Sequence, residues 1–239
     1  MKEMQVTSRI RDVQQRIRDA CSHANRPESE VTLLAVSKTK PLTDLIEAYE
    51  AGQRHFAENY AQEAVEKRQQ APFQDAQWHF IGPLQSNKTR PIAEHFDWVH
   101  TVDRMKIAQR LSDQRPPDRP ALNVLIQVNI SHDPAKAGVL PSQVMALADK
   151  VALLPNLKLR GLMTITANDL SEETLRQQFM ELKNLQSTLI KQHSDCTELS
   201  MGMSGDFPLA IACGATMVRI GSDIFGSRTP NQTTQRSNA

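Results

Sequence analysis

The sequence is poor in several features that mark common protein classes. Its three cysteines, Cys21, Cys196 and Cys213, form neither a Cys-x-x-Cys pair nor an even-numbered framework. This argues against a disulfide-stabilised secreted fold and, with no paired Cys and His ligands, against a structural zinc site. The segment 1–5 contains no apolar signal core, and no stretch approaches the roughly 18 consecutive apolar residues of a membrane-spanning helix. We therefore expect a cytoplasmic protein with reduced thiols and no membrane segment.

The chain also lacks an excess of charge of either sign. It has 28 basic and 27 acidic residues and a net charge of +1, and no long basic run is present. Proteins that bind nucleic acid concentrate lysine and arginine on one face, where these residues neutralise phosphates. The composition therefore gives no support to a nucleic-acid partner.

What the chain does contain is a repeated unit of a short apolar strand followed by a polar helix. An amphipathic helix at residues 4–21 comes first. Strands are then expected at 31–37, 54–56, 78–81, 98–100, 122–130, 157–165, 198–201 and 217–220. Helices are expected at 42–51, 58–70, 86–94, 103–111, 141–153, 171–193, 207–213 and 222–225.

Eight such units in about 200 residues are typical of a (β/α)8 TIM barrel, here with an extra N-terminal helix. A doubly wound open sheet is the alternative, but it would usually need fewer strands. No segment has the length and composition of an interdomain linker, so one domain is expected over residues 1–226. The polar segment 227–239 has no apolar periodicity and is expected to be a disordered tail.

The strand at 31–37 ends immediately before Lys38. Its residues are mostly apolar or small, as in a parallel strand covered on both faces, and Pro41 then opens a helical pattern. A lysine at the carboxyl end of a barrel strand lies where this fold places its chemistry, and a partly desolvated lysine can attack an aldehyde. On its own, however, such a lysine is more often a strand-end residue whose charged head reaches water.

The loops after the last two expected strands form a second candidate site. In TIM barrels these loops commonly bind phosphate. They span residues 201–206, with Ser204 between glycines, and residues 219–226, with Ser222 after Gly221. Glycines allow backbone N–H groups to approach an anion, and the serines add hydroxyl donors. Each Gly-Ser pair alone is an ordinary turn signal, but the two together, after the two expected strands, predict a phosphate site.

Three further polar side chains lie in or beside expected strands. Asn59 follows the strand at 54–56, His79 lies in the strand at 78–81, and Arg219 lies in the apolar run at 217–220. His79 alone would more often be a hydrogen-bonded core histidine, and Arg219 could pair with a buried carboxylate. A lysine and a phosphate site facing each other across the barrel mouth suit an aldehyde that carries a phosphate. Pyridoxal 5'-phosphate (PLP) is the obvious candidate.

Five motifs carry a family resemblance, at residues 34–41, 78–88, 160–163, 199–204 and 217–221. Through them the chain resembles the pyridoxal-phosphate homeostasis proteins, single-domain relatives of the alanine racemase N-terminal barrel. One departure is Ala57, where the family usually has glycine, and it affects the expected position of the neighbouring Asn59. The resemblance implies that Lys38 forms a Schiff base with PLP and that Arg219 contacts the pyridine nitrogen. It also implies that the PLP ring is contacted by Asn59, His79 and Met163. The phosphate would be bound by Ser204, Gly221 and Ser222.

The same residues favour a carrier of PLP over an enzyme. Arg219 keeps its proton at any accessible pH, so a pyridine nitrogen facing it remains a weak electron sink. Racemisation needs two acid–base groups on opposite faces of the substrate, and Lys38 can supply only one. Of the two tyrosines, Tyr49 lies inside a helix and Tyr60 is expected to pack at a helix start. In the racemases, as the resemblance implies, the opposing group comes from an added carboxyl-terminal domain that has no counterpart in this sequence.

We therefore predict a monomeric protein that holds PLP, takes part in vitamin B6 homeostasis and delivers PLP to apo-enzymes without catalytic turnover. A PLP-dependent amino-acid racemase of low or specialised activity remains the alternative. A third interpretation is a protein–protein adaptor that uses the amphipathic helix at 4–21.

Overall fold

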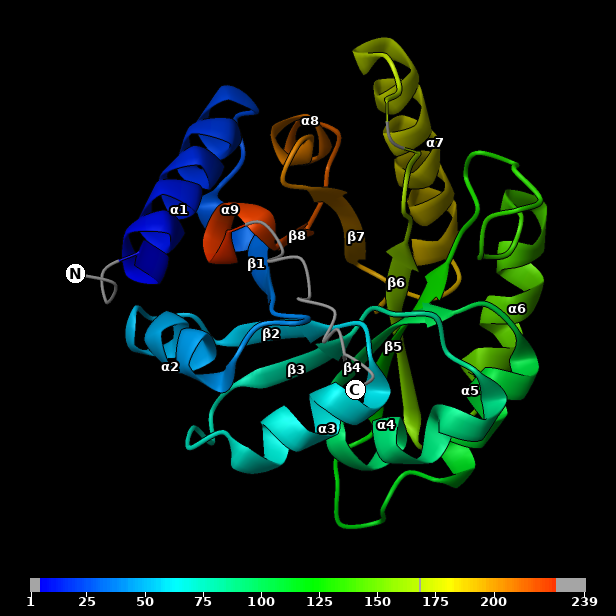
Figure 1. Ribbon diagram of the computed structural model, residues 1–239. Helices are drawn as coiled ribbons and strands as arrows, with labels where there is room; N and C mark the ends of the chain where they lie inside the picture. The colour runs from blue at the N-terminus through cyan, green and yellow to red at the C-terminus, as the bar shows by residue number, and fades with distance from the viewer. Residues whose placement is uncertain (1–4, 168, 227–239) are drawn as a thin grey trace, which may run out of the picture.

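The structure, a computed structural model, describes residues 5–167 and 169–226. Parallel strands form a closed barrel in the order β1 to β8, and β1 pairs with β8. Helices surround the barrel, as Figure 1 shows. The prediction of a (β/α)8 barrel with an extra N-terminal helix is confirmed, whereas the predicted tail at 227–239 lies outside the described residues. The strands are β1 (Thr32–Val36), β2 (His55–Glu58), β3 (Gln77–Phe80), β4 (Trp98–Val102), β5 (Leu122–Gln127), β6 (Leu157–Met163), β7 (Glu198–Met203) and β8 (Met217–Ile220).

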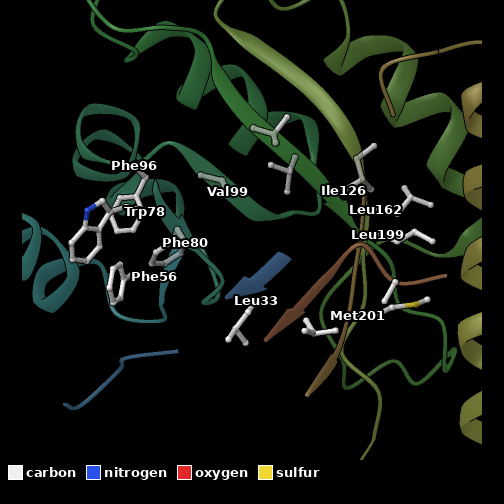
Figure 2. Packing of buried hydrophobic residues seen from close by; sticks show 14 of the residues in the cluster. Leu33, Phe56, Trp78, Phe80, Phe96, Val99, Ile126, Leu162, Leu199 and Met201 are labelled. Atoms are coloured by element: carbon white, nitrogen blue, oxygen red, sulfur yellow. The ribbon is translucent and has the colours of Figure 1, made fainter. Parts of the chain in front are cut away.

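Alternation of side chains along each strand produces two apolar layers. Outward-facing residues pack under the helices, and Figure 2 shows part of this layer, where Phe56, Trp78 and Phe96 lie close together. A smaller cluster fills the barrel interior. Its members are Leu34, Val36, Ala57, Ile81, Leu125, Met163 and Met217.

The helix α1 (Gln5–His23) lies beside α8 and α9 at the outside of the barrel (Figure 1). Its buried stripe consists of the residues that the apolar spacing picks out, namely Val6, Ile10, Val13, Ile17 and Cys21. Among the described residues, no helix is long and apolar enough to cross a membrane. The other helices are α2 (Leu42–Glu50), α3 (Ala61–Gln70), α4 (Thr89–His95), α5 (Met105–Asp113), α6 (Val144–Val151), α7 (Glu172–Ile190), α8 (Phe207–Ala212) and α9 (Ser222–Phe225), with 3-10 turns η1 (Glu28–Glu30), η2 (Ser86–Lys88) and η3 (Pro141–Gln143).

Several element boundaries differ from the sequence-based expectation. β2 extends to Glu58 because its last residues pair with β3, so α3 begins at Ala61 and not at residue 58. β5 and β6 end earlier than expected, at Gln127 and Met163, and the apolar residues that follow lie in loops. α5 begins at Met105, with Arg104 and not Asp103 at the position before the helix, and the Asp103 carboxylate pairs with Arg104.

Candidate functional site

A cavity of about 420 Å³ opens at the carboxyl ends of the strands, the end at which TIM barrels carry their active sites. Apolar side chains, among them Ile81, Ile165 and Met203, form one part of its wall. Polar residues from the loops after β1, β2, β7 and β8 form another part. The residues predicted from the sequence that line the cavity are Lys38, Asn59, Ser204, Arg219, Gly221 and Ser222.

The other two predicted residues, His79 and Met163, are fully buried and are not among the described residues that line the cavity. Met163 ends β6 within the inner apolar cluster. The His79 ring stacks on Trp98 with ring centroids 5.4 Å apart, and both of its nitrogens form hydrogen bonds with other histidines. Its surroundings therefore match those of a hydrogen-bonded core histidine, and its contact with a ligand ring remains a prediction.

Carboxylates hold the chain on both sides of Lys38, in the turn between β1 and α2. Ser37 is fully buried, and its hydroxyl donates to Oε1 of Glu58 at 2.6 Å. Thr39 has a φ of 61°, a left-handed conformation that β-branched residues rarely adopt. The N–H of Thr39 donates to Oε1 of Glu63 at 2.6 Å. The position of Lys38 is thus fixed by side chains from β2 and α3.

Lys67 of α3 joins these two carboxylates. Its amine donates to Oε1 of Glu58 at 2.9 Å, to Oε1 of Glu63 at 2.6 Å and to the carbonyl oxygen of Ser37 at 2.6 Å. Burial raises the pKa of the Glu58 carboxyl, although the charge of Lys67 opposes the shift. Sequence reasoning missed Lys67, because a lysine four residues after a glutamate is typical of an exposed helix pair.

The two predicted phosphate loops lie side by side. The hydroxyl of Ser222 donates to Oγ of Ser204 at 3.2 Å. A Cβ on Gly221 would lie 3.2 Å from the carbonyl oxygen of Val36, so a side chain there would press on the end of β1. A Cβ on Gly205 would meet no atom within 4 Å. The two loops therefore present serine hydroxyls and accessible backbone at the cavity wall.

Arg219 enters the cavity from β8, and its charge has no carboxylate partner within ion-pair distance among the described residues. Nη1 donates to Oγ of Ser200 at 2.7 Å, and Nη2 donates to the carbonyl oxygen of Thr164 at 2.8 Å. Burial lowers the pKa of Arg219 to about 10, so the guanidinium keeps its proton at neutral pH. The charge of Asp206 acts on Arg219 only from beyond ion-pair distance, and a buried cation of this kind suits a ligand that accepts hydrogen bonds.

Comparison with known proteins gives the family. The profile of the family described as alanine racemase, N-terminal domain, matches residues 9–229. The pyridoxal phosphate homeostasis protein of Haemophilus influenzae is 51% identical over 231 residues, covering 94% of this chain and 97% of that protein. The protein of the same name from Escherichia coli K12 is 48% identical over 231 residues, covering 93% and 97%. The chain belongs to the pyridoxal phosphate homeostasis protein family.

Solved structures agree with this membership. PipY of Synechococcus elongatus, whose structure has PLP bound, has a TM-score of 0.81 at 37% identity, covering 93% of this chain and 100% of PipY. A protein from Bifidobacterium adolescentis described as unknown has a TM-score of 0.87 at 32% identity, covering 93% and 95%. Alanine racemase of Corynebacterium glutamicum, at 15% identity with a TM-score of 0.69, covers 90% of this chain and 61% of the racemase, and it shares the fold alone.

Ala57, where the resemblance leads us to expect glycine, is accommodated in the strand. Ala57 is fully buried in β2 and pairs with Val36 and His79, and its φ is not positive. The backbone of the neighbouring Asn59 passes close to Gly82, where a Cβ would lie 1.9 Å from the carbonyl oxygen of Asn59, so only glycine leaves room there. Oδ1 of Asn59 is buried and has no hydrogen-bond partner among the described residues, although the residue lines the cavity. A buried acceptor without a partner points to a ligand that donates.

Arg16 connects the N-terminal helix to the phosphate loops. Its Nη1 lies 2.6 Å from Oδ2 of Asp223, and Nη2 donates to the carbonyl oxygen of Ser204 at 3.5 Å. Its guanidinium also lies 4.7 Å from the ring centroid of Phe207. One side chain of α1 therefore contacts the residues after both β7 and β8. No sequence pattern indicates this role, because Arg16 is one of several charged residues on the exposed side of the helix.

Proposed function

We propose that this chain binds PLP in the cavity and takes part in PLP homeostasis as a carrier, without catalytic turnover of its own. The observation that carries the proposal is the cavity itself, which brings Lys38 together with Ser204, Ser222 and Arg219. PLP bound to PipY supports the same ligand. We also infer a single domain over 1–226, a cytoplasmic location and a monomer.

The residues present fit this cofactor. Ser204, Ser222 and the backbone at Gly221 suit the phosphate, and Arg219 suits an acceptor such as the ring nitrogen. The orphaned Oδ1 of Asn59 suits a hydroxyl donor on the ring. When bound, PLP supplies an aldehyde that condenses with a lysine amine, and we assign that amine to Lys38.

The carrier interpretation depends on the absence of a second acid–base group opposite Lys38. Among the described residues, neither tyrosine lines the cavity. Tyr60 is half-exposed, and the hydroxyl of Tyr49 donates to Asp75. Racemisation requires a proton to leave one face of the substrate and another to arrive on the opposite face. A racemase of low or specialised activity is therefore the weaker candidate.

Cofactor attachment is tested by titrating the protein with PLP and recording the absorbance of the Schiff base, followed by borohydride reduction and peptide mass mapping. We expect the mass increase on Lys38. Lys38→Ala should still bind PLP weakly, because the charge-assisted phosphate contacts contribute about 1.5–3 kcal/mol each. Lys40→Ala, a second lysine at the cavity, is the matched control and should keep the Schiff-base absorbance. An adduct found on another lysine of the wild-type protein would overturn the assignment.

The carrier role is tested by two further measurements. The loaded protein should reactivate a PLP-dependent apo-enzyme, which would identify delivery of the cofactor. Incubation with L-alanine and other L-amino acids should give no D-isomer above the level produced by PLP alone. Sustained formation of D-isomers would favour the racemase.

A further inference from the structure

A row of polar side chains crosses the interior of the barrel and ends on Arg219. His55 of β2, His79 of β3 and His100 of β4 follow one another on neighbouring strands. Nδ1 of His55 lies 3.0 Å from Nε2 of His79, and Nδ1 of His79 lies 2.9 Å from Nε2 of His100. Nδ1 of His100 lies 2.9 Å from Oγ of Ser200, which accepts from Nη1 of Arg219 at 2.7 Å. The row therefore links one end of β2 to the cavity.

The two inner histidines of this row are neutral. His79 and His100 are fully buried, and burial lowers the pKa of both imidazoles well below the ordinary value. The charge of Arg219 adds to the effect for His100, and a proton on His100 or His55 would add to it for His79. A neutral imidazole has one N–H donor and one acceptor nitrogen. Each inner histidine must therefore donate to one neighbour and accept from the other.

Arg219 sets the direction of the whole row, because a guanidinium only donates. Oγ of Ser200 accepts from Arg219, and the one other partner of this hydroxyl among the described residues is Nδ1 of His100. Ser200 therefore donates to His100, which must carry its proton on Nε2 and donate to Nδ1 of His79. His79 in turn carries its proton on Nε2 and donates to Nδ1 of His55. Aligned hydrogen bonds of this kind strengthen one another in a buried site.

We propose that the three histidines and Ser200 are positioning residues for Arg219, and that protonation of His55 weakens ligand binding in the cavity. Arg219 has five N–H donors, of which one goes to Ser200 and one to the carbonyl oxygen of Thr164. These two bonds fix the plane of the guanidinium, which lines the cavity. The inference rests on the PLP binding proposed above for its ligand, and on the interior hydrogen bonds for its geometry.

His55, the partly exposed end of the row, is the residue whose protonation makes ligand binding depend on pH. Among residues 5–167 and 169–226, the titratable groups that act on this imidazole are the carboxylate of Asp97, whose charge raises the pKa of His55, and His79. Burial opposes Asp97 and lowers the pKa overall. A second proton on His55 would occupy Nδ1 and face the N–H of His79, so two donors would meet. Reversing the tautomers of both inner histidines removes this clash but leaves the Ser200 hydroxyl hydrogen without an acceptor.

The order of the tautomers is tested on the protein alone, by long-range ¹H–¹⁵N correlation of histidine-labelled protein between pH 5.5 and 8. We expect His79 and His100 to remain neutral with the proton on Nε2. A proton on Nδ1 of either residue, or a charged imidazole at pH 7.5, would contradict the proposed direction of the hydrogen bonds in the row. This measurement does not depend on PLP.

The link to the ligand is tested with His55→Asn, since the asparagine amide can accept from His79 near the position of Nδ1 but does not titrate. The dissociation constant for PLP is measured at pH 7.5 and 5.5. We expect the two proteins to agree at pH 7.5 and the wild type to lose more affinity than His55→Asn at pH 5.5, by less than the roughly tenfold of a full pKa unit, because burial already lowers the pKa of His55. Titration of the PLP phosphate affects both proteins equally and cancels in the ratio.

His132→Asn is the matched control, because His132 is exposed and lies 3.7 Å from Glu181, and it should retain the wild-type pH profile. Equal pH profiles for the wild type and His55→Asn would overturn the link between His55 and the cavity. Absence of PLP binding in every protein would overturn the proposed function. The tautomers measured by NMR would still test the direction of the hydrogen bonds in the row.

Discussion

The amine of Lys67 lies 2.9 Å from Oε1 of Glu58, and the two side chains are only 9% and 0% exposed. The same oxygen of Glu58 accepts the hydroxyl of Ser37, the residue before Lys38. A buried ion pair is expensive to form but much more expensive to break on one side, because an uncompensated charge remains. Breaking this pair would therefore both destabilise the barrel and disturb the backbone next to Lys38.

Lys67→Met should lower the free energy of unfolding by about 3–5 kcal/mol, the usual cost of removing one partner of a buried pair. The double variant Lys67→Met, Glu58→Gln should lose less than the single variant, because the fully buried carboxylate is removed and Glu63, the other partner of Lys67, is partly exposed to water. Urea denaturation measures both effects. Lys106→Met, at an exposed position of α5, is the control; equal losses at positions 67 and 106 would contradict the role of the pair.

Gly82→Ala should destabilise the protein by roughly 1–3 kcal/mol, because its Cβ would lie 1.9 Å from the carbonyl oxygen of Asn59 and the backbone must move. In a domain of this size the melting temperature should fall by about 2–4 °C per kcal/mol. Gly205→Ala introduces the same methyl group where no atom lies within 4 Å, so its melting temperature should not change. Similar melting temperatures for the two variants would show that the close approach of Gly82 to the backbone of Asn59 does not matter for stability.

Ser204→Ala and Ser222→Ala should each weaken PLP binding by about 1.5–3 kcal/mol, since each removes a hydrogen bond to a charged phosphate. Pyridoxal, which lacks the phosphate, should bind the variants and the wild type equally. The comparison of the two ligands by absorbance titration separates phosphate contacts from general damage to the cavity. If the variants lost equal affinity for pyridoxal and for PLP, the two serines would not be the phosphate ligands.

Stability should fall as the pH falls below about 6.5, because His79 and His100 have pKa values well below that ordinary value in the folded protein. The unfolded chain then binds protons that the folded chain excludes, so each histidine removes up to about 1.4 kcal/mol per pH unit. Above this range both states are neutral and the contribution is constant. Urea denaturation from pH 5 to 7.5 should show a shallower slope for His100→Asn; an unchanged slope would show that His100 charges in the fold.

Arg16→Ala should change stability by no more than about 1 kcal/mol, because both side chains of the pair with Asp223 are partly exposed to water. Its effect should appear in PLP affinity, since Arg16 also contacts the loop that carries Ser204. Arg11→Ala, at an exposed position of the same helix, provides the comparison. If Arg11→Ala lost as much PLP affinity as Arg16→Ala, the effect would come from the net charge of the helix and not from the contacts of Arg16.

The periodic apolar pattern was sufficient to predict the order of strands and helices, and the fixed place of the site in such barrels located Lys38, Ser204 and Ser222. The ends of β2 were not predictable, because Glu58 joins that strand only through pairing with β3. The partners of His79 depend on the register of three strands, which apolar spacing does not determine. The contacts of Arg16 and Lys67 likewise depend on where long side chains reach in three dimensions.

Closure of the barrel between β1 and β8 has a consequence for the order of events during synthesis. The cavity combines Lys38, which follows β1, with Arg219, Gly221 and Ser222 near the other end of the described chain. The amine of Lys40 also donates to the carbonyl oxygen of Phe225 at 2.9 Å. A nascent chain on the ribosome therefore exposes Lys38 long before the loops that carry Ser204 and Ser222 exist. Binding of PLP as proposed above therefore requires that the last strand has left the ribosome and closed the ring.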